Sequence, residues 1–155
     1  MVIHCLQRTQ RIPTDMATIW EFISSPKNLK LITPDYMGFD ITSEAVSNTM
    51  YAGQIITYIV RPIMGIPLHW CTEITHVEEG RYFVDEQRNG PYAFWHHQHH
   101  IAAIEGGVEM LDIVHYAAPL GVLGDLFTPI LIRPRLEEIF DYRFKKIEEM
   151  FGRIA

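Results

Sequence analysis

The stretch FVDEQRNGPYAFWHHQHHI, residues 83–101, carries the densest group of polar and aromatic side chains in the chain and decides how its sheet is arranged. Two extended runs flank Asn89-Gly90-Pro91, a turn sequence typical of a β-hairpin. Because successive side chains of a strand point to opposite faces, alternate residues share a face. One face of the hairpin is therefore predicted to hold Phe83, Asp85, Gln87, Trp95, His97, His99 and Ile101.

Pro91 decides the expected register of this hairpin. A two-residue Asn-Gly loop would pair Arg88 with Pro91, whose nitrogen has no hydrogen to donate. A three-residue loop pairs Arg88 with Tyr92 instead and places Asp85 opposite Trp95. We therefore predict the three-residue loop, with a carboxylate, an amide, two imidazoles and an indole on one surface.

The side chains of this surface need partners if they face the interior. A buried polar group without a hydrogen bond costs roughly 1–3 kcal/mol. The groups could bond one another around a wet cavity, or they could bind a ligand. A solvent-exposed sheet face is the alternative, and the large rings of Phe83 and Trp95 argue against it.

Length and composition indicate one soluble domain. A chain of 155 residues can bury a real core, and 48% hydrophobic with 21% charged residues argues against disorder. The net charge is -6, with no strong cluster of basic residues, so nucleic-acid binding is not expected. We predict a single domain over residues 1–155.

Cysteine usage and hydropathy bear on the compartment. The chain has two cysteines and no apparent secretion signal at its start, which favours a cytoplasmic protein with free thiols. No apolar run approaches the ~20 residues of a membrane-spanning helix. Residues 117–132 are the longest candidate, but prolines, glycines and Asp125 interrupt them, leaving a loosely membrane-facing surface as a minor alternative.

The remaining chain alternates between extended and helical patterns. Two short helices, beginning near Met16 and Pro26, follow the first strand. The last segment has one broad apolar stripe at helical spacing, which includes Arg143. Pro129 and Pro134 should break or kink the preceding helix, so the long helix is expected to start near Arg135. The strands expected outside the hairpin are 2–12, 37–45, 54–61, 68–77 and 108–116.

This order predicts an α+β fold. Consecutive strands with short links form an antiparallel sheet, and one amphipathic helix cannot cover both of its faces. We therefore expect a curved seven-stranded antiparallel sheet wrapped around the long C-terminal helix, with two short helices between strands 1 and 2. Such a sheet commonly encloses a pocket between itself and the helix.

Four motifs resemble a known superfamily over nearly the whole chain. They are F-x-D-x-Q-x-x-G-P-Y (83–92), W-x-H-x-H-x-I (95–101), D-x-V-x-Y (112–116) and P-L-G-x-L-G (119–124). With the element order, they resemble the SRPBCC group of the START-like, helix-grip superfamily, related to polyketide cyclases and dehydrases. The nearest resemblance is to small domains labelled cell-division-inhibitor-like. Ile101 replaces a phenylalanine of related domains, and Pro129 and Pro134 are less typical.

The resemblance implies a helix-grip fold with a hydrophobic ligand cavity and no settled activity. Carried onto this chain, it makes ten residues candidates for the cavity lining, and the alternation of the hairpin selects the same faces independently. The ten candidates are Tyr58, Trp70, Phe83, Asp85, Gln87, Trp95, His97, His99, Asp112 and Tyr116.

Two kinds of chemistry could use these residues. The His97-x-His99 pair points both imidazoles to one side, as in metal sites, and Asp85 or Asp112 could add an oxygen ligand. No third histidine lies in the inward set, so we predict neither a metal nor another cofactor. Alternatively, His97 with Asp85 or Asp112 could serve as the acid–base group of a cyclase or dehydratase acting on an aromatic or polyketide-like substrate.

Binding requires less than catalysis, and we predict it as the function. A curled sheet, a helix and a few placed polar groups are the general anatomy of a small-ligand site. The expected partner is a small hydrophobic or lipid-like molecule, with no nucleic acid and no integral membrane association, and the sequence identifies no protein partner. The apolar loop at residues 62–67 could nevertheless contact another protein or act as a gate to the pocket.

Overall fold

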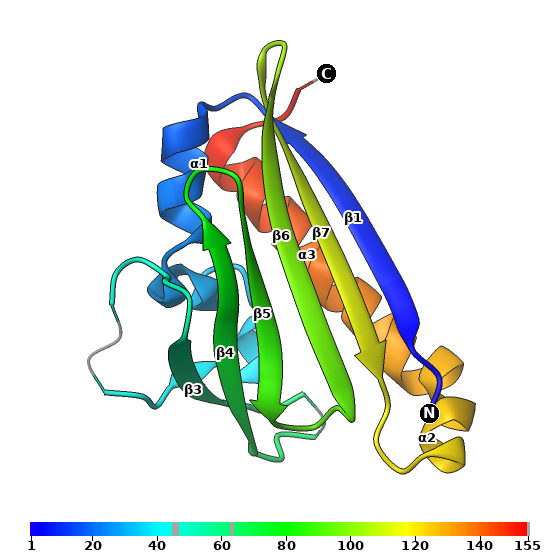
Figure 1. The fold of residues 1–155 in the computed structure, drawn as a ribbon. Helices are drawn as coiled ribbons and strands as arrows, with labels where there is room; N and C mark the ends of the chain where they lie inside the picture. Colours follow the sequence, from blue (N-terminus) through cyan, green and yellow to red (C-terminus); the bar gives the residue numbers. More distant parts are fainter. Residues whose placement is uncertain (45–46, 63, 155) are drawn as a thin grey trace.

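A single curved sheet organises the molecule (Figure 1). The computed structural model describes residues 1–44, 47–62 and 64–154, and within them seven antiparallel strands form one sheet in the order β1-β7-β6-β5-β4-β3-β2. This confirms the predicted seven-stranded antiparallel architecture. The strands are β1 (His4–Ile12), β2 (Asp40–Ile41), β3 (Gln54–Val60), β4 (Leu68–Glu78), β5 (Tyr82–Asn89), β6 (Phe94–Ile104) and β7 (Gly107–Ala117).

Short helical segments connect β1 to β2. Helix α1 (Met16–Ile23) is capped by Asp15, whose carboxylate accepts the backbone N–H of Thr18. The second predicted helix is the 3₁₀ turn η1 (Pro26–Lys30), which is followed by a further turn, η2 (Asp35–Met37). The strand expected over 37–45 is reduced to the two residues of β2 at the sheet edge, and residue 45 lies outside the described residues.

The C-terminal helical region is continuous where a break or a kink was expected. It runs as α2 (Val122–Phe127), the π-helical turn η3 (Thr128–Ile132) and α3 (Arg133–Phe151). Pro129 and Pro134 therefore do not end the helix. The wider π turn removes the need for the i→i−4 hydrogen bonds that proline cannot donate, so the chain passes both prolines without stopping.

The register of the central hairpin differs from the prediction by two residues. Asp85 pairs with His97 rather than with Trp95. The cause is the side chain of Gln87, which donates to the carbonyl of Tyr92 at 2.7 Å and accepts its N–H at 3.1 Å. This side chain replaces a backbone pair and lengthens the loop. A shift of two residues preserves the face of every side chain.

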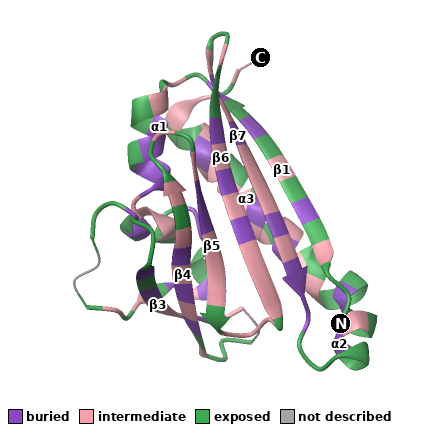
Figure 2. Cartoon of the chain, in the orientation of Figure 1, coloured by how far each residue is buried: buried purple, intermediate pink, exposed green. Residues whose placement is uncertain are grey.

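Helix α3 crosses one face of the sheet from end to end (Figure 1). It buries Leu136, Phe140 and Ile147 against the strands. Buried residues alternate with partly buried ones along the middle of β4 and β6, which marks the face that packs against the helix (Figure 2). None of the helices in the described ranges combines the length and the apolar character needed to cross a membrane.

Candidate functional site

A cavity of about 410 Å³ lies between the sheet and α3. Its wall is mostly apolar, because the inward positions of β3, β4 and β5 and of α3 carry aliphatic and aromatic side chains. Strand β6 adds the polar part of the wall. Residues that line the cavity include Leu29, Met37, Ile56, Tyr58, Val60, Trp70, Ile74, Phe83, Trp95, Leu136, Ile139 and Phe140.

The ten predicted site residues fall into two groups. Seven line the cavity: Tyr58, Trp70, Phe83, Asp85, Trp95, His97 and His99. The other three lie outside its lining. Gln87 binds the backbone of the hairpin loop, and Tyr116 is buried beside Tyr92 and His4. Asp112, on β7, lies behind the two histidines and binds both of them.

One wall of the cavity is a chain of aromatic rings. Tyr58 stacks on Trp70 with ring centroids 5.7 Å apart, and Trp70 meets Trp95 edge to face at 5.2 Å. The hydroxyl of Tyr58 hydrogen-bonds that of Thr72, across the pair of strands. The indole Nε1 of Trp70 is buried and has no hydrogen-bond partner among the described residues.

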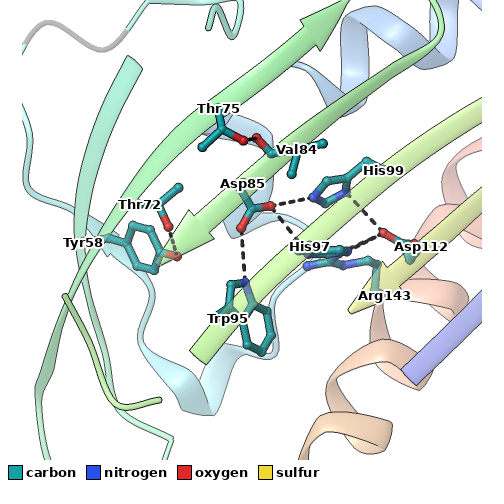
Figure 3. Close-up of polar contacts among 10 residues, drawn as sticks. All are labelled: Tyr58, Thr72, Thr75, Val84, Asp85, Trp95, His97, His99, Asp112 and Arg143. Atoms are coloured by element: carbon teal, nitrogen blue, oxygen red, sulfur yellow. Dashed lines mark hydrogen bonds and ion pairs between the residues drawn. The ribbon is translucent and has the colours of Figure 1, made fainter. Parts of the chain in front are cut away.

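Two carboxylates and two imidazoles form a closed ring at the polar wall (Figure 3). We call Asp85, His97, His99 and Asp112 the polar ring. Asp85 Oδ2 lies 2.7 Å from His99 Nε2 and 3.6 Å from His97 Nδ1. Asp112 Oδ1 lies 2.8 Å from His97 Nε2 and 3.2 Å from His99 Nδ1. Each carboxylate therefore faces both imidazoles.

Rings packed around the histidines hold them in place. Phe83 stacks on His99 with centroids 4.1 Å apart, and His99 lies 3.7 Å from His97. Phe140 of α3 meets His97 edge to face. Trp95 donates its Nε1 hydrogen to Asp85 Oδ1 at 3.2 Å, which fixes the first carboxylate. The His–x–His spacing on β6 places both imidazoles on one face, as the alternation predicts.

The polar ring separates the pKa values of its two histidines. Burial and the neighbouring His99 lower the pKa of His97 to about 4, although hydrogen bonding to Asp112 opposes this. Burial also acts to lower the pKa of His99, but hydrogen bonds to Asp112 and Asp85 outweigh it and raise that pKa. Those bonds keep the pKa of both carboxyls low despite their burial. His97 is therefore the neutral imidazole at neutral pH, and His99 is the more basic of the two.

Arg143 on α3 is a site residue that the sequence analysis did not select. Its guanidinium lies 3.9 Å from Asp112 Oδ1 and over the ring of Phe140, and it lines the cavity. Its Nε is buried without a hydrogen-bond partner among the described residues. The signal was present in the sequence, since Arg143 is a cation within the apolar stripe of an amphipathic helix.

The arrangement can do three things chemically. The apolar wall can hold a hydrophobic molecule, and the neutral imidazole of His97 beside Asp112 can exchange a proton. Asp85, His97 and His99 can each offer one metal-binding atom, and these three atoms lie within 4.8 Å of one another.

The apolar loop at residues 62–67, which could contact another protein or act as a gate, is only partly described. Residue 63 lies outside the described residues, whereas Pro62 lines the cavity and Met64 is 94% exposed.

Comparisons with known structures identify the fold. A START superfamily protein from Mycobacterium smegmatis has a TM-score of 0.71 at 14% identity, over 96% of this chain and 97% of its own. Major latex-like protein 151 from Panax ginseng gives 0.69 at 13% identity, over 97% and 99%. Protein Ms6760 from M. smegmatis gives 0.67 at 18% identity, over 97% and 96%. No protein-family model and no curated protein matches the sequence.

The chain therefore has the SRPBCC-type, START-like fold that its sequence motifs predicted. The likeness covers nearly the whole of each chain, so one fold accounts for the molecule. Sequence identities this low support a shared fold, and the function has to be inferred from the site itself.

Proposed function

We propose that this protein binds an elongated apolar molecule with a polar end in the cavity between the sheet and α3. The observation that carries the proposal is the cavity, whose volume of about 410 Å³ and largely aromatic and aliphatic wall suit such a molecule. Small-ligand sites typically measure roughly 300–1,000 Å³ and combine an apolar wall with a few fixed polar groups. The aromatic rings of the wall offer large contact areas for an apolar chain.

Two unpaired donors support a ligand whose polar end accepts hydrogen bonds. Trp70 Nε1 and Arg143 Nε are both buried, and both residues line the cavity. A buried donor without a partner costs roughly 1–3 kcal/mol, so a ligand acceptor that reaches either group gains that amount. Arg143 further favours an anionic acceptor, because a guanidinium forms its strongest hydrogen bonds with carboxylates and phosphates. A fatty acid has the required chemistry.

Displacement of an environment-sensitive apolar dye tests this proposal. We expect a fatty acid to displace the dye at lower concentration than the fatty alcohol of equal chain length. Arg143→Met should remove that difference while keeping dye binding. Lys145→Met, at an exposed position of the same helix, is the matched control and should behave as the parent protein. A protein that neither binds the dye nor retains a lipid-like molecule in native mass spectrometry would contradict the proposal.

A second candidate function is acid–base catalysis by His97. The specific observation is the 2.8 Å contact between His97 Nε2 and Asp112 Oδ1. This contact holds the imidazole in one orientation, which a general base requires. The matching substrate is an aromatic or polyketide-like molecule that loses water or cyclises. His97→Gln should abolish turnover of such a substrate and leave dye binding intact. Equal turnover by the variant would exclude this role.

A further inference from the structure

The two carboxylates of the polar ring face opposite edges of the imidazoles. Asp112 Oδ1 is reached by His97 Nε2 at 2.8 Å and His99 Nδ1 at 3.2 Å. A carboxylate oxygen only accepts hydrogen bonds, so His97 Nε2 carries a hydrogen and donates it to Asp112. Each imidazole then has its second nitrogen on the side of Asp85. This contact fixes the tautomer of His97, whose Nδ1 is left with its lone pair toward Asp85.

The atoms on the side of Asp85 include one nitrogen lone pair that faces a carboxylate oxygen. Asp85 Oδ2 faces His99 Nε2 at 2.7 Å and His97 Nδ1 at 3.6 Å. His99 Nε2 can donate a hydrogen to this oxygen, whereas His97 Nδ1 presents a lone pair, which a carboxylate oxygen repels. A proton on His99 Nε2 relieves one of these contacts and leaves the other. A metal ion satisfies all three atoms at once.

We propose that Asp85 Oδ2, His97 Nδ1 and His99 Nε2 bind one divalent transition-metal ion at the wall of the cavity (Figure 3). Asp85 Oδ2 lies 2.7 Å from His99 Nε2 and 3.6 Å from His97 Nδ1, and the three residues each offer one ligand atom within 4.8 Å of the others. A tetrahedral ion with bonds of about 2.0–2.2 Å needs its ligand atoms roughly 3.4 Å apart. The present separations of the ligand atoms differ from this value by on the order of one ångström, and small rotations of the side chains can close that difference. This inference goes beyond ligand binding and does not depend on it.

The groups around the three ligands are those that metal sites use to orient their ligands. Histidine ligands commonly donate their other N–H to a carboxylate, and Asp112 Oδ1 lies 2.8 Å from His97 Nε2 and 3.2 Å from His99 Nδ1. Trp95 holds Asp85 through the oxygen that would not bind the ion. Arg143 lies 3.9 Å from Asp112 and offsets its charge. With Asp85 and Asp112 ionised and Arg143 charged, a divalent ion leaves the site with a net charge of about +1.

The chemistry of the ligands indicates the class of ion. Two imidazoles and one carboxylate suit Zn²⁺, Co²⁺ or Fe²⁺ better than Mg²⁺ or Ca²⁺, which prefer oxygen. Three protein ligands leave at least one coordination position free. All three residues line the cavity, so a ligand or water there can reach that position. The third ligand is Asp85, which is why a sequence search for a third histidine did not favour a metal.

Co²⁺ titration of tag-free, chelator-treated protein tests the proposal. We expect one Co²⁺ per chain at neutral pH, with the visible absorption of a low-coordinate ion, displaced by one equivalent of Zn²⁺. His99→Gln and Asp85→Asn should each lose this saturable spectrum. Asp112→Asn removes an orienting group rather than a ligand, so it should keep the stoichiometry and weaken binding roughly 10- to 100-fold.

A second pair of histidines provides the matched control. His96 and His115 lie on the opposite sheet face, with ring centroids 6.2 Å apart, and could bind an ion adventitiously. The double variant His96→Ala/His115→Ala should bind Co²⁺ as the parent protein does. Loss of the spectrum in this variant would overturn the proposal, because the ion would then lie outside the cavity.

Nuclear magnetic resonance keeps the test independent of folding in the variants. In the parent protein, Zn²⁺ should shift the ¹⁵N resonances of His97 Nδ1 and His99 Nε2 and leave those of His96 unchanged. Absence of saturable binding by the folded parent protein, with His99 remaining protonated on both nitrogens, would show that a proton fills this role and would overturn the proposal. Dye displacement can succeed or fail in either case, so the two proposals are separable.

Discussion

The polar ring and the surface of α2 and η3 both depart from the usual distribution of side chains, in opposite directions. The polar ring places two carboxylates in the interior, with side chains only 15% and 14% exposed. Helix α2 and the turn η3 instead expose large apolar side chains (Figure 2). The exposed large apolar residues of this segment are Val122, Leu123, Leu126, Phe127, Ile130 and Leu131, and Leu120 just before it is also exposed.

The two regions differ in the contacts that compensate for buried charges in one and for exposed apolar side chains in the other. Every member of the polar ring finds its partners within the ring, Trp95 or Arg143, so its stability depends on the complete set. The α2 surface has no comparable partner among the described residues. Its attachment depends on a few buried contacts, such as Gly124 against Pro119 and the hydroxyl of Thr128 on the carbonyl of Gly124. The ring should therefore be sensitive to any single change, and the exposed surface insensitive.

The largest expected effect comes from Asp112→Ala. This change leaves His97, His99 and Arg143 without their common anionic partner, and breaking such a buried set costs about 3–5 kcal/mol. Urea denaturation should measure the loss of unfolding free energy. Glu109→Ala on the same strand is the control, because its pair with Arg11 is largely exposed and contributes less than about 1 kcal/mol. Equal losses in the two variants would mean that the ring is not specially stabilised.

Acid should weaken the ring through His97 before it protonates the carboxyls. The folded pKa of His97 is about 4, below its ordinary value of 6.5, so the unfolded chain binds this proton more readily and stability falls as pH drops through that window. The raised pKa of His99 changes the stability only at pH values above that window. The lowered pKa values of Asp85 and Asp112 change it only at pH values below that window. Arg143 keeps its charge throughout.

The magnitude is on the order of 1–3 kcal/mol for a shift of this size. Urea midpoints of chelator-treated protein between pH 4 and 6.5 should show it, and His97→Gln should flatten the profile. Leu123→Ser, on the exposed surface, should retain the parent pH dependence. A His97→Gln profile as steep as the parent's would assign the acid sensitivity to other groups.

Gly124→Ala should detach α2 from the rest of the fold. A Cβ at this position would lie 1.8 Å from the carbonyl oxygen of Pro119, so the backbone must move. We expect a loss of about 1–3 kcal/mol, as for other overpacked sites, although alanine itself favours a helix. Hydrogen exchange should show faster exchange confined to α2 and η3. Unchanged exchange in α2, or a gain in stability, would contradict this account.

A double-mutant cycle on His97 and Asp112 should show that the two act as a unit. Each single change to alanine leaves the other side chain poorly paired, so the double variant should lose less than the sum of the two. Coupling energies between contacting groups are roughly 0.5–3 kcal/mol. Urea denaturation of the four proteins gives the value. Additive losses would show that the 2.8 Å contact contributes nothing specific.

The sequence predicted the faces of the strands better than their pairing. Alternation placed Asp85, His97 and His99 together because the face of a strand residue depends only on its parity, and a shift of two residues preserves parity. The pairing itself depends on the side chain of Gln87, which binds the backbone of Tyr92. No local sequence pattern predicts that contact, because a glutamine side chain before a turn can also bond to water or to other groups.

The helical region shows the same limit. Proline rules predicted a break or a kink at Pro129 and Pro134, but they assume the i→i−4 ladder that the π turn replaces. Arg143 lay in the predicted apolar stripe. Only the fold shows that its guanidinium lies near the carboxylate of Asp112 and over the ring of Phe140. Periodicity therefore predicts which side faces inward, while three-dimensional contacts decide what a buried polar group meets there.

The smallest effect is expected on the exposed surface, from Leu123→Ser combined with Leu126→Ser. Both side chains are more than 60% exposed, at 62% and 63%, so their removal costs little burial, and serine is only slightly poorer than leucine in a helix. The double variant should lose less than about 1 kcal/mol of unfolding free energy. Urea denaturation at two protein concentrations measures it. A larger loss that appears only at high concentration would show that copies of the chain cover this surface, because association stabilises the folded state by mass action. A larger loss at both concentrations would mean that α2 packs more tightly than its exposure indicates, and the contrast with the polar ring would weaken.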